Sequence, residues 1–178
     1  RYAGKQTTLG DIMEVGDVAE KFFIPKDRLY YAEPEVQHSD ETEGRLPEND
    51  RKTWQYIKGG KKLLRKSASG HEYVFSEGPI SMIDEYDKPA RTMLTSEGSF
   101  NRSTHIVRDK KTGKIRLLTP IEAERIQGFP DDWTKECLVN GEVTEMPLNK
   151  RRFMMGNALV VNLIEQMERQ LSDIFDNE

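Results

Sequence analysis

One segment, RLLTPIEAERIQGFPDDW, constrains the fold most because it specifies a short helix with two defined ends. Thr119 and Glu122 have the spacing of a capping box, in which each side chain accepts the other residue's backbone amide. Pro120 suits the first helical position, where no amide donor is needed. Gly128 favours a left-handed stop, and the proline two residues later prevents continuation. The sequence therefore predicts a helix over 119–128, which local chemistry alone would class as an ordinary structural helix.

Composition narrows the setting of the chain. Its 178 residues suffice for one domain or for one domain with an appendage. The net charge of −4 means that any nucleic-acid contact must use a local basic patch. Cys137 is the single cysteine, so no disulfide can form within the chain, and a reducing compartment fits. No apolar run approaches about 18 residues, which predicts no membrane span. The N-terminus has neither Met nor a signal-peptide core and indicates a cut inside a longer protein.

The chain divides into regions of different character. Residues 33–50 are strongly acidic and are predicted to form a loop or an acidic linker. Residues 51–71 are basic and contain no acidic residue. Short strands are expected within 71–84 and 90–96, and a hairpin is expected over 103–118. The middle of the chain is therefore predicted to be a small, irregular β-rich unit.

The C-terminal part has helical periodicity. From Asn157 onward, apolar residues recur at spacings of three and four, which predicts an amphipathic helix of about five turns capped by Asn157. Free amides at Gly156-Asn157 would then be able to bind an anion or a cofactor carboxylate. A plain helix cap explains the same residues equally simply.

The basic stretch 51–71 is the main indication of a partner. Lysine and arginine neutralise backbone phosphates, and this contribution dominates nucleic-acid affinity. Trp54 and Tyr56 stand among them and can pack on a sugar or a base, although a solvated charged face with inward aromatics is the alternative. A later loop, TSEGSFNRS, is rich in glycine and small polar residues and can approach a DNA groove closely, or it is an ordinary loop. The sequence shows binding chemistry and no arrangement of catalytic or metal-ligating residues.

Taken together, these segments resemble the C-terminal part of DNA (cytosine-5)-methyltransferases. RLLTPIEAERIQGFPDDW is similar to the ninth conserved motif of that family, and GNALVV is similar to the tenth, in which Gly-Asn opens the last helix. RTMLTSEG is similar to the Thr-Leu segment of the variable target-recognition region, with Met93 where leucine is usual. LGDIM and FFIP are similar to the segment that opens this region. The motifs follow one another in the order of the family.

The resemblance implies a fold and an activity. We expect an α+β chain in which a small, irregular β-rich DNA-recognition domain, 1–150, is followed by a long C-terminal helix, 151–178, that belongs to an absent Rossmann-like large domain. The full-length enzyme would bind double-stranded DNA, flip a cytosine out of the helix and methylate its C5 from S-adenosylmethionine. The Pro-Cys nucleophile and the main cofactor loop of the family are absent from this sequence. The chain is therefore expected to contain no catalytic residue and to be inactive alone.

The resemblance also implies residue roles. The ninth motif would be structural, no metal would be needed, and Asn157 and Ala158 would contact S-adenosylmethionine. The candidates for base or phosphate contact are Lys58, Lys61, Lys62, Arg65, Arg91, Thr92, Ser96, Asn101 and Arg102.

The expected setting is a bacterial restriction–modification system. The full-length enzyme would be a cytoplasmic, nucleoid-associated monomer, and this chain's partners would be DNA and the missing catalytic domain. The alternatives are a non-catalytic DNA-binding module or degenerate methyltransferase relative, and a protein-interaction domain that uses the basic patch on an acidic partner.

Overall fold

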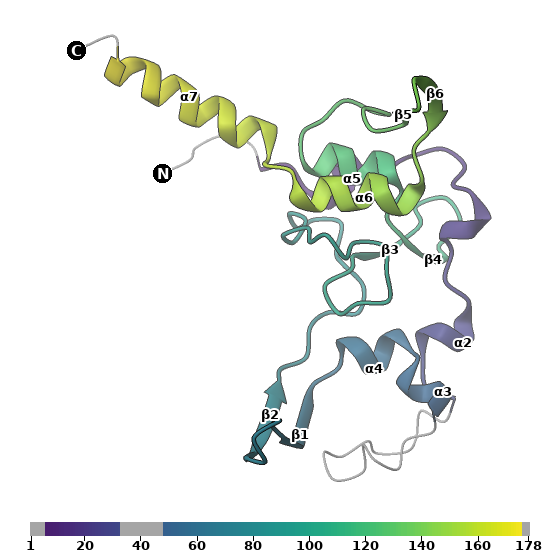
Figure 1. Cartoon of the computed structure of the whole chain (residues 1–178). Coiled ribbons are helices and arrows are strands. Elements are labelled where there is room, and N and C mark those ends of the chain that lie inside the picture. Colours follow the sequence, from purple (N-terminus) through teal and green to yellow (C-terminus); the bar gives the residue numbers. More distant parts are fainter. Residues whose placement is uncertain (1–5, 33–47, 176–178) are drawn as a thin grey trace.

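The computed structural model of the chain describes residues 6–32 and 48–175 (Figure 1), so most of the predicted acidic linker lies outside the described residues. The elements are, in order, α1 (Leu9–Ile12), η1 (Glu20–Phe22), α2 (Lys26–Leu29), α3 (Glu48–Arg51), α4 (Trp54–Lys58), β1 (Lys61–Lys66), β2 (Glu72–Glu77), β3 (Ile106–Arg108), β4 (Ile115–Leu117), α5 (Pro120–Ile126), β5 (Glu136–Val139), β6 (Glu142–Glu145), α6 (Leu148–Asn157) and α7 (Val161–Phe175). The chain is thus mixed α and β, as predicted.

The strands form separate antiparallel hairpins instead of one sheet. Within the described residues, β1 pairs with β2, β3 with β4, and β5 with β6. The β3–β4 hairpin confirms the hairpin predicted over 103–118, and its strand residues Ile106, Val107 and Ile115 are buried. The β1–β2 hairpin projects from the end of the molecule opposite to α5 and α6 (Figure 1). Only the β3–β4 hairpin supplies buried apolar strand residues to the interior, and the other two hairpins are surface features.

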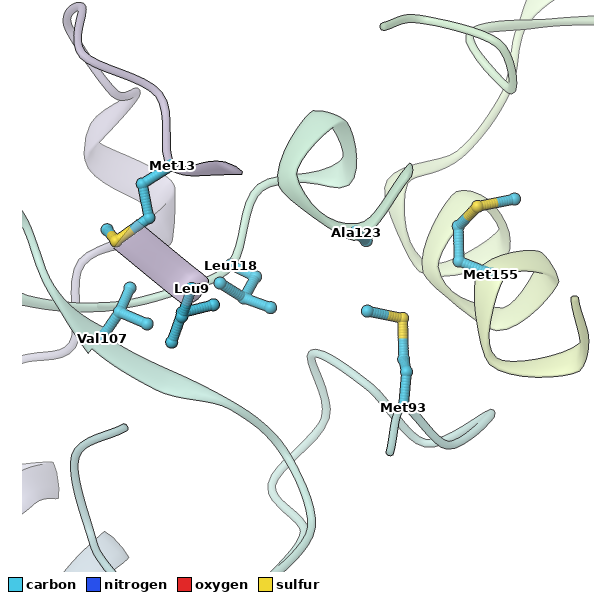
Figure 2. Packing of buried hydrophobic residues seen from close by; sticks show 7 residues of the cluster. All are labelled: Leu9, Met13, Met93, Val107, Leu118, Ala123 and Met155. Carbon is cyan, nitrogen blue, oxygen red and sulfur yellow. The ribbon is translucent and has the colours of Figure 1, made fainter. Parts of the chain in front are cut away.

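The larger of the two cores joins parts that are distant in the sequence. Figure 2 shows its buried apolar side chains converging from α1, β3, α5, α6 and the loop before β3. They are Leu9, Met13, Met93, Val107, Leu118, Ala123 and Met155. A fully buried side chain of Leu or Met contributes about 1.5–3 kcal/mol to stability. This cluster therefore ties the N-terminal helix and the two helices α5 and α6 to the central hairpin.

A second core lies beneath the central hairpin on the side of α2 and α4. Leu29, Trp54, Ile106 and Ile115 are buried together in it. The Trp54 ring also meets the Phe100 ring edge to face, with 4.9 Å between their centroids. Trp54, which had been considered for base stacking, is therefore an interior residue that anchors α4.

The predicted helix over 119–128 is confirmed as α5, and its capping is as expected. The amide of Glu122 donates to Thr119 Oγ1 at 3.2 Å, and the amide of Thr119 donates to Glu122 Oε2 at 2.9 Å. Gly128 has a φ of +80°, the left-handed conformation that a helix stop requires. Local sequence therefore determines both ends of this helix.

Glu122 also completes a buried ion-pair network. Arg116 is fully buried, and its Nη1 and Nη2 each donate to one Glu122 oxygen at 2.7 Å. Its Nε donates to Asp109 Oδ2 at 3.2 Å. Burial alone would lower the pKa of Arg116, but the two carboxylates raise it above its ordinary value. Arg116 thus lies in the interior.

Several sequence-based expectations about elements are wrong. Residues 90–94 have no regular secondary structure, and Arg91 is held there by its side-chain bonds to Asp84. The strands β1, β5 and β6 were not predicted, although Asn140 and Gly141, with φ of 54° and 85°, form the type of tight turn that Asn-Gly favours. The expected division into domains after residue 150 stays a prediction, and residue 150 itself lies within α6.

The C-terminal helix starts later than predicted. Asn157 is the last residue of α6, and α7 begins at Val161, so the prediction that Asn157 caps the long helix is wrong. The cause is local, because Ala158 adopts an extended conformation that interrupts the helical hydrogen bonds. α7 points away from the rest of the chain (Figure 1). Its apolar side chains Leu163, Met167 and Leu171 are about half exposed, at 53%, 51% and 49%. None of the helices in the described ranges is both long and apolar enough to cross a membrane.

Candidate nucleic-acid interface

The β1–β2 hairpin carries basic residues on a projecting ribbon. Lys62 faces Ser76 and Arg65 faces Tyr73 in the strand register, which extends from Lys61–Glu77 to Lys66–Glu72. Along a strand, successive side chains point to opposite faces of the sheet. Lys62, Leu64 and Lys66 therefore share one face, and Lys61, Leu63 and Arg65 share the other.

The basic residues of this hairpin differ in whether a carboxylate lies close to them. Lys61 lies 3.5 Å from Glu77 and Lys66 lies 3.7 Å from Glu72. Within the described part of the chain, Lys62 and Arg65 have no carboxylate within ion-pair distance. The Arg65 guanidinium lies 3.7 Å from the centroid of the Phe75 ring, a cation–π contact that orients it. Lys62 and Arg65 are thus the two cations of the hairpin that remain available to a phosphate.

Lys58 does not belong to this surface, and the prediction that it contacts DNA does not fit the structure. Its side chain is 1% exposed and its Nζ lies 3.9 Å from Asp84 Oδ2, without a hydrogen-bond acceptor among the described residues. Burial lowers the pKa of Lys58 to about 8, although Asp84 opposes the shift. Asp84 is already engaged, since Arg91 binds it through Nε at 2.6 Å and Nη2 at 3.1 Å. A phosphate cannot reach the Lys58 ammonium in this conformation.

Arg91 and Arg102 connect the loop before β3 to the base of the hairpin. Arg91 donates to the carbonyls of Ser103 and Thr104 at 3.1 and 3.2 Å, in addition to Asp84. Arg102 donates to the carbonyls of Ile57 and Gly59 at 3.3 and 2.9 Å, and also to that of Gly78. Both side chains are only partly exposed, at 35% and 21%. Their hydrogen bonds fix the loop and leave few donors for DNA.

The other loop candidates differ in accessibility. Thr92 is exposed, whereas Ser96 and Asn101 are half-buried. Asn101 Oδ1 accepts the amide of Ser103 at 2.9 Å, so this side chain shapes the turn. The hydroxyls of Thr92 and Ser96 donate no hydrogen bond to another described residue and remain available. The structure therefore brings the loop and the hairpin together through Arg102, and it leaves Thr92, Ser96, Lys62 and Arg65 as their free polar groups.

A buried carboxylate supports the loop from below. Glu97 Oε1 accepts the amide of His105 at 3.0 Å, and Glu97 Oε2 lies 2.8 Å from His105 Nδ1. Both side chains are almost fully buried. His105 is thus a hydrogen-bonding interior residue. Sequence offered no signal for this pair, because a spacing of eight residues in a loop has no fixed geometry.

Helix α6 packs directly onto the same loop. A Cβ atom at Gly156 would overlap the carbonyl of Leu94 and the amide nitrogen of Thr95. Gly98, with a φ of +78°, likewise leaves room for the Arg152 side chain. A shallow groove of about 220 Å³ lies between loop and helix, lined by Thr95, Ser96, Ser99, Asn149, Lys150 and Arg152 among others. The glycine of the GNALVV motif is therefore a close-packing residue that positions the loop.

The two cofactor candidates lie where α6 ends. Asn157 is exposed, and Ala158 is half-buried beside a second groove of about 610 Å³ that Gln127 also lines. Gln127 Nε2 donates to the Met155 carbonyl at 2.8 Å, while its buried Oε1 has no partner in the described chain. No amide here sits at a helix start, so the expected helix-head anion site at Gly156-Asn157 does not exist. The described residues also contain no cluster of His, Cys, Asp or Glu able to hold a metal ion.

Comparison with known proteins places this geometry in a family. The family described as C-5 cytosine-specific DNA methylase matches residues 2–173. The Type II methyltransferase M.Sau3AI of Staphylococcus aureus is 43% identical over 164 residues, which cover 92% of this chain and 37% of that protein. The chain thus spans little more than a third of the length of this relative. Because the family match extends over almost the whole chain and includes α5, the loop before β3 and the GNALVV segment, this chain belongs to the C-5 cytosine-specific DNA methylases.

Proposed function

We propose that this chain is the DNA-recognition part of a DNA (cytosine-5)-methyltransferase. The observation that carries the proposal is that a member of this family has a projecting hairpin whose Lys62 and Arg65 face no carboxylate in the described chain, and that this hairpin is fixed to the loop before β3. In this reading the chain holds duplex DNA while residues outside it supply the nucleophile. A cytosine is flipped out of the duplex and receives a methyl group at C5.

The residues of this chain divide between holding DNA and holding the loop. Lys62 and Arg65 supply phosphate contacts, with Lys61 beside them, and Thr92 and Ser96 offer hydroxyls to base edges or phosphates. Phosphate contacts position a protein on DNA, and base contacts provide specificity. Arg91, Asn101 and Arg102 act by fixing the loop, since their polar atoms are engaged within the chain.

We propose that this chain contacts only one side of S-adenosylmethionine. Ala158 and the unpartnered Gln127 Oε1 border an apolar groove that suits one side of an adenosyl group. Asn157 stands next to it with an exposed amide. The cofactor, when bound, supplies the methyl group, and we propose that most of its contacts come from the rest of the enzyme. The exposed apolar face of α7 is proposed to pack on that part.

The name of the relative, a Type II methyltransferase, supports a role in a bacterial restriction–modification system. A cytoplasmic monomer that associates with the nucleoid is the corresponding proposal for the complete enzyme. A non-catalytic DNA-binding protein remains the second candidate, because the features that distinguish it lie outside this chain.

Bisulfite sequencing separates these two functions. Plasmid DNA is isolated from a methylation-free host that expresses the complete open reading frame, with a host carrying the empty vector as control. Methylated cytosines in one fixed short context are expected and would also give the recognition sequence. Soluble protein without methylation would contradict the enzyme and favour the binding protein.

A further inference from the structure

Arg152 is the most unusual buried cation in the described structure. Arg152 is 7% exposed, and its Nε has no hydrogen-bond partner among the described residues. Its Nη2 donates to the Leu118 carbonyl at 3.1 Å, and its guanidinium lies 5.2 Å from the centroid of the Phe22 ring. Unlike Arg116 and Arg151, it has no carboxylate within ion-pair distance among the described residues. An isolated buried charge costs several kcal/mol unless something pairs with it. The Phe22 ring and, at longer range, Glu97 compensate this charge only in part, so an anionic ligand would stabilise it further.

The surroundings of Arg152 form a site for a small anion. It lines the groove of about 220 Å³ between the loop and α6, which is smaller than a pocket for a drug-sized molecule and suits a single group. Lys150 is exposed at the same groove, and the Thr95 and Ser96 hydroxyls there have no hydrogen-bond acceptor among the described residues. The groove also meets the first turn of α6 at Asn149, whose amide has no acceptor within the helix, whereas the Lys150 amide donates to the Pro147 carbonyl at 2.9 Å.

Glu97 is the one carboxylate among the residues that line this groove, and its oxygens do not point at a bound anion. Both oxygens of Glu97 are turned to His105, one accepting its amide at 3.0 Å and the other 2.8 Å from its ring nitrogen. The groove therefore presents two cations and two free hydroxyls to its opening.

We propose that the groove between the loop before β3 and the start of α6 binds a backbone phosphate of DNA through Arg152 and Lys150, with the hydroxyls of Thr95 and Ser96 as additional donors. This inference rests on the proposed function, because it takes DNA as the source of the phosphate. It adds a phosphate contact at a second place, apart from those proposed for the β1–β2 hairpin. The two contacts lie at opposite ends of the loop, so together they fix its orientation along the duplex.

The test uses the full-length protein and the salt dependence of its DNA affinity. Each phosphate contact contributes about 0.9 to the slope of log K against log salt concentration. Lys150→Gln is expected to reduce the slope by about that amount and to weaken recognition-site and unrelated DNA equally. Thr95→Glu should weaken binding further, because it places a carboxylate in the groove. Lys88→Gln, an exposed lysine outside the groove, should leave the slope unchanged.

A chemical scan identifies the phosphate itself. Duplexes with one neutral methylphosphonate at successive positions are bound to the wild type and to Lys150→Gln. One position should weaken the wild type and have no further effect on Lys150→Gln. Arg152→Gln is informative only if its thermal melt is retained, so Lys150 and Thr95 carry the test.

Three results would overturn the proposal. An unchanged slope for Lys150→Gln, with the wild type binding DNA, rejects this contact and leaves the proposed function intact. A wild type without DNA affinity rejects both. Inorganic phosphate that raises the melting temperature of the wild type but not of Lys150→Gln, with equal DNA slopes, shows a site for a free anion instead.

Discussion

Two regions of this molecule use arginine and lysine in opposite ways. Around α5, Arg116 is buried and forked onto Glu122, so its charge is neutralised inside the fold. On the β1–β2 hairpin, Lys62 and Arg65 are exposed and face no carboxylate in the described chain. The same residue types thus stabilise the interior in one place and remain available to a ligand in the other. Position in the fold, and not residue type, determines which charges remain available to a ligand.

The largest effect should come from breaking the interior network. Glu122→Ala removes the capping bond to Thr119 and leaves the buried Arg116 with Asp109 as its remaining carboxylate. Breaking a buried pair costs about 3–5 kcal/mol, which would unfold much of the protein. Urea denaturation followed by circular dichroism measures the loss.

The matched control is Asp131→Ala. Asp131 pairs with Arg125 at 2.6 Å, but its side chain is 51% exposed, and surface pairs contribute at most about 1 kcal/mol. Equal losses for the two variants would contradict the distinction between interior and surface charges.

Lys58 is an exception to this comparison, because it is an interior lysine whose charge is not well neutralised. Its Nζ lies 3.9 Å from Asp84 and has no hydrogen-bond partner among the described residues. Lys58→Met should raise the free energy of unfolding at pH 7 by about 2–3 kcal/mol, since the folded state no longer keeps an ammonium in a buried site. The burial penalty of the wild type is complete below the folded pKa of about 8.

The advantage of Lys58→Met should shrink as the pH rises. Between pH 8 and the ordinary lysine pKa, the folded wild type releases its proton while the unfolded chain keeps it, so wild-type stability rises with pH. Denaturation at pH 7 and pH 10 tests the sign. Lys62→Met, at an exposed position, is measured alongside as the control for the substitution itself. A loss of stability on Lys58→Met at both pH values would mean that Asp84 needs the ammonium.

Gly156 tests how tightly α6 packs against the loop before β3. Gly156→Ala places a methyl group against the Leu94 and Thr95 backbone and should cost about 1–3 kcal/mol through overpacking. Gly16→Ala is the control, since a Cβ atom there meets nothing within 4 Å. A shift in melting temperature for Gly156→Ala no larger than for Gly16→Ala would show that the loop yields easily.

The smallest effect on stability should come from the hairpin. Lys62→Gln and Arg65→Gln should each change the free energy of unfolding by less than about 0.5 kcal/mol. Each should nevertheless reduce the salt slope of DNA binding by about 0.9, as expected for one lost phosphate contact. Lys135→Gln, directly before β5, serves as the charge-matched control, because β5 lies at the end of the molecule opposite to the β1–β2 hairpin (Figure 1). Equal slopes for hairpin and control variants would remove the hairpin from the DNA surface.

Local signals in the sequence determined the ends of α5 and the β3–β4 hairpin, because capping residues and turn glycines act within a few residues. They did not reveal that Lys58 is buried, since the sequence of a basic segment is the same whether its lysines face solvent or a buried carboxylate such as Asp84. They also misplaced the start of α7, because the periodicity of apolar residues continues across the break at Ala158. The contacts of Arg152 and Gly156 with the loop depend on long-range packing, which no single-sequence spacing encodes.

Gly156 has a further consequence for how this chain can change. Its missing side chain lets the backbone of Leu94 and Thr95 rest against α6, so the loop has a fixed height above the helix. Side chains along the loop can be exchanged without changing this backbone contact. An inserted residue at this point would instead move the loop away from α6 or displace the helix. New preferences for DNA sequence are therefore expected to arise by replacing side chains on an unchanged loop backbone, with changes of length confined to the free hairpin between β1 and β2.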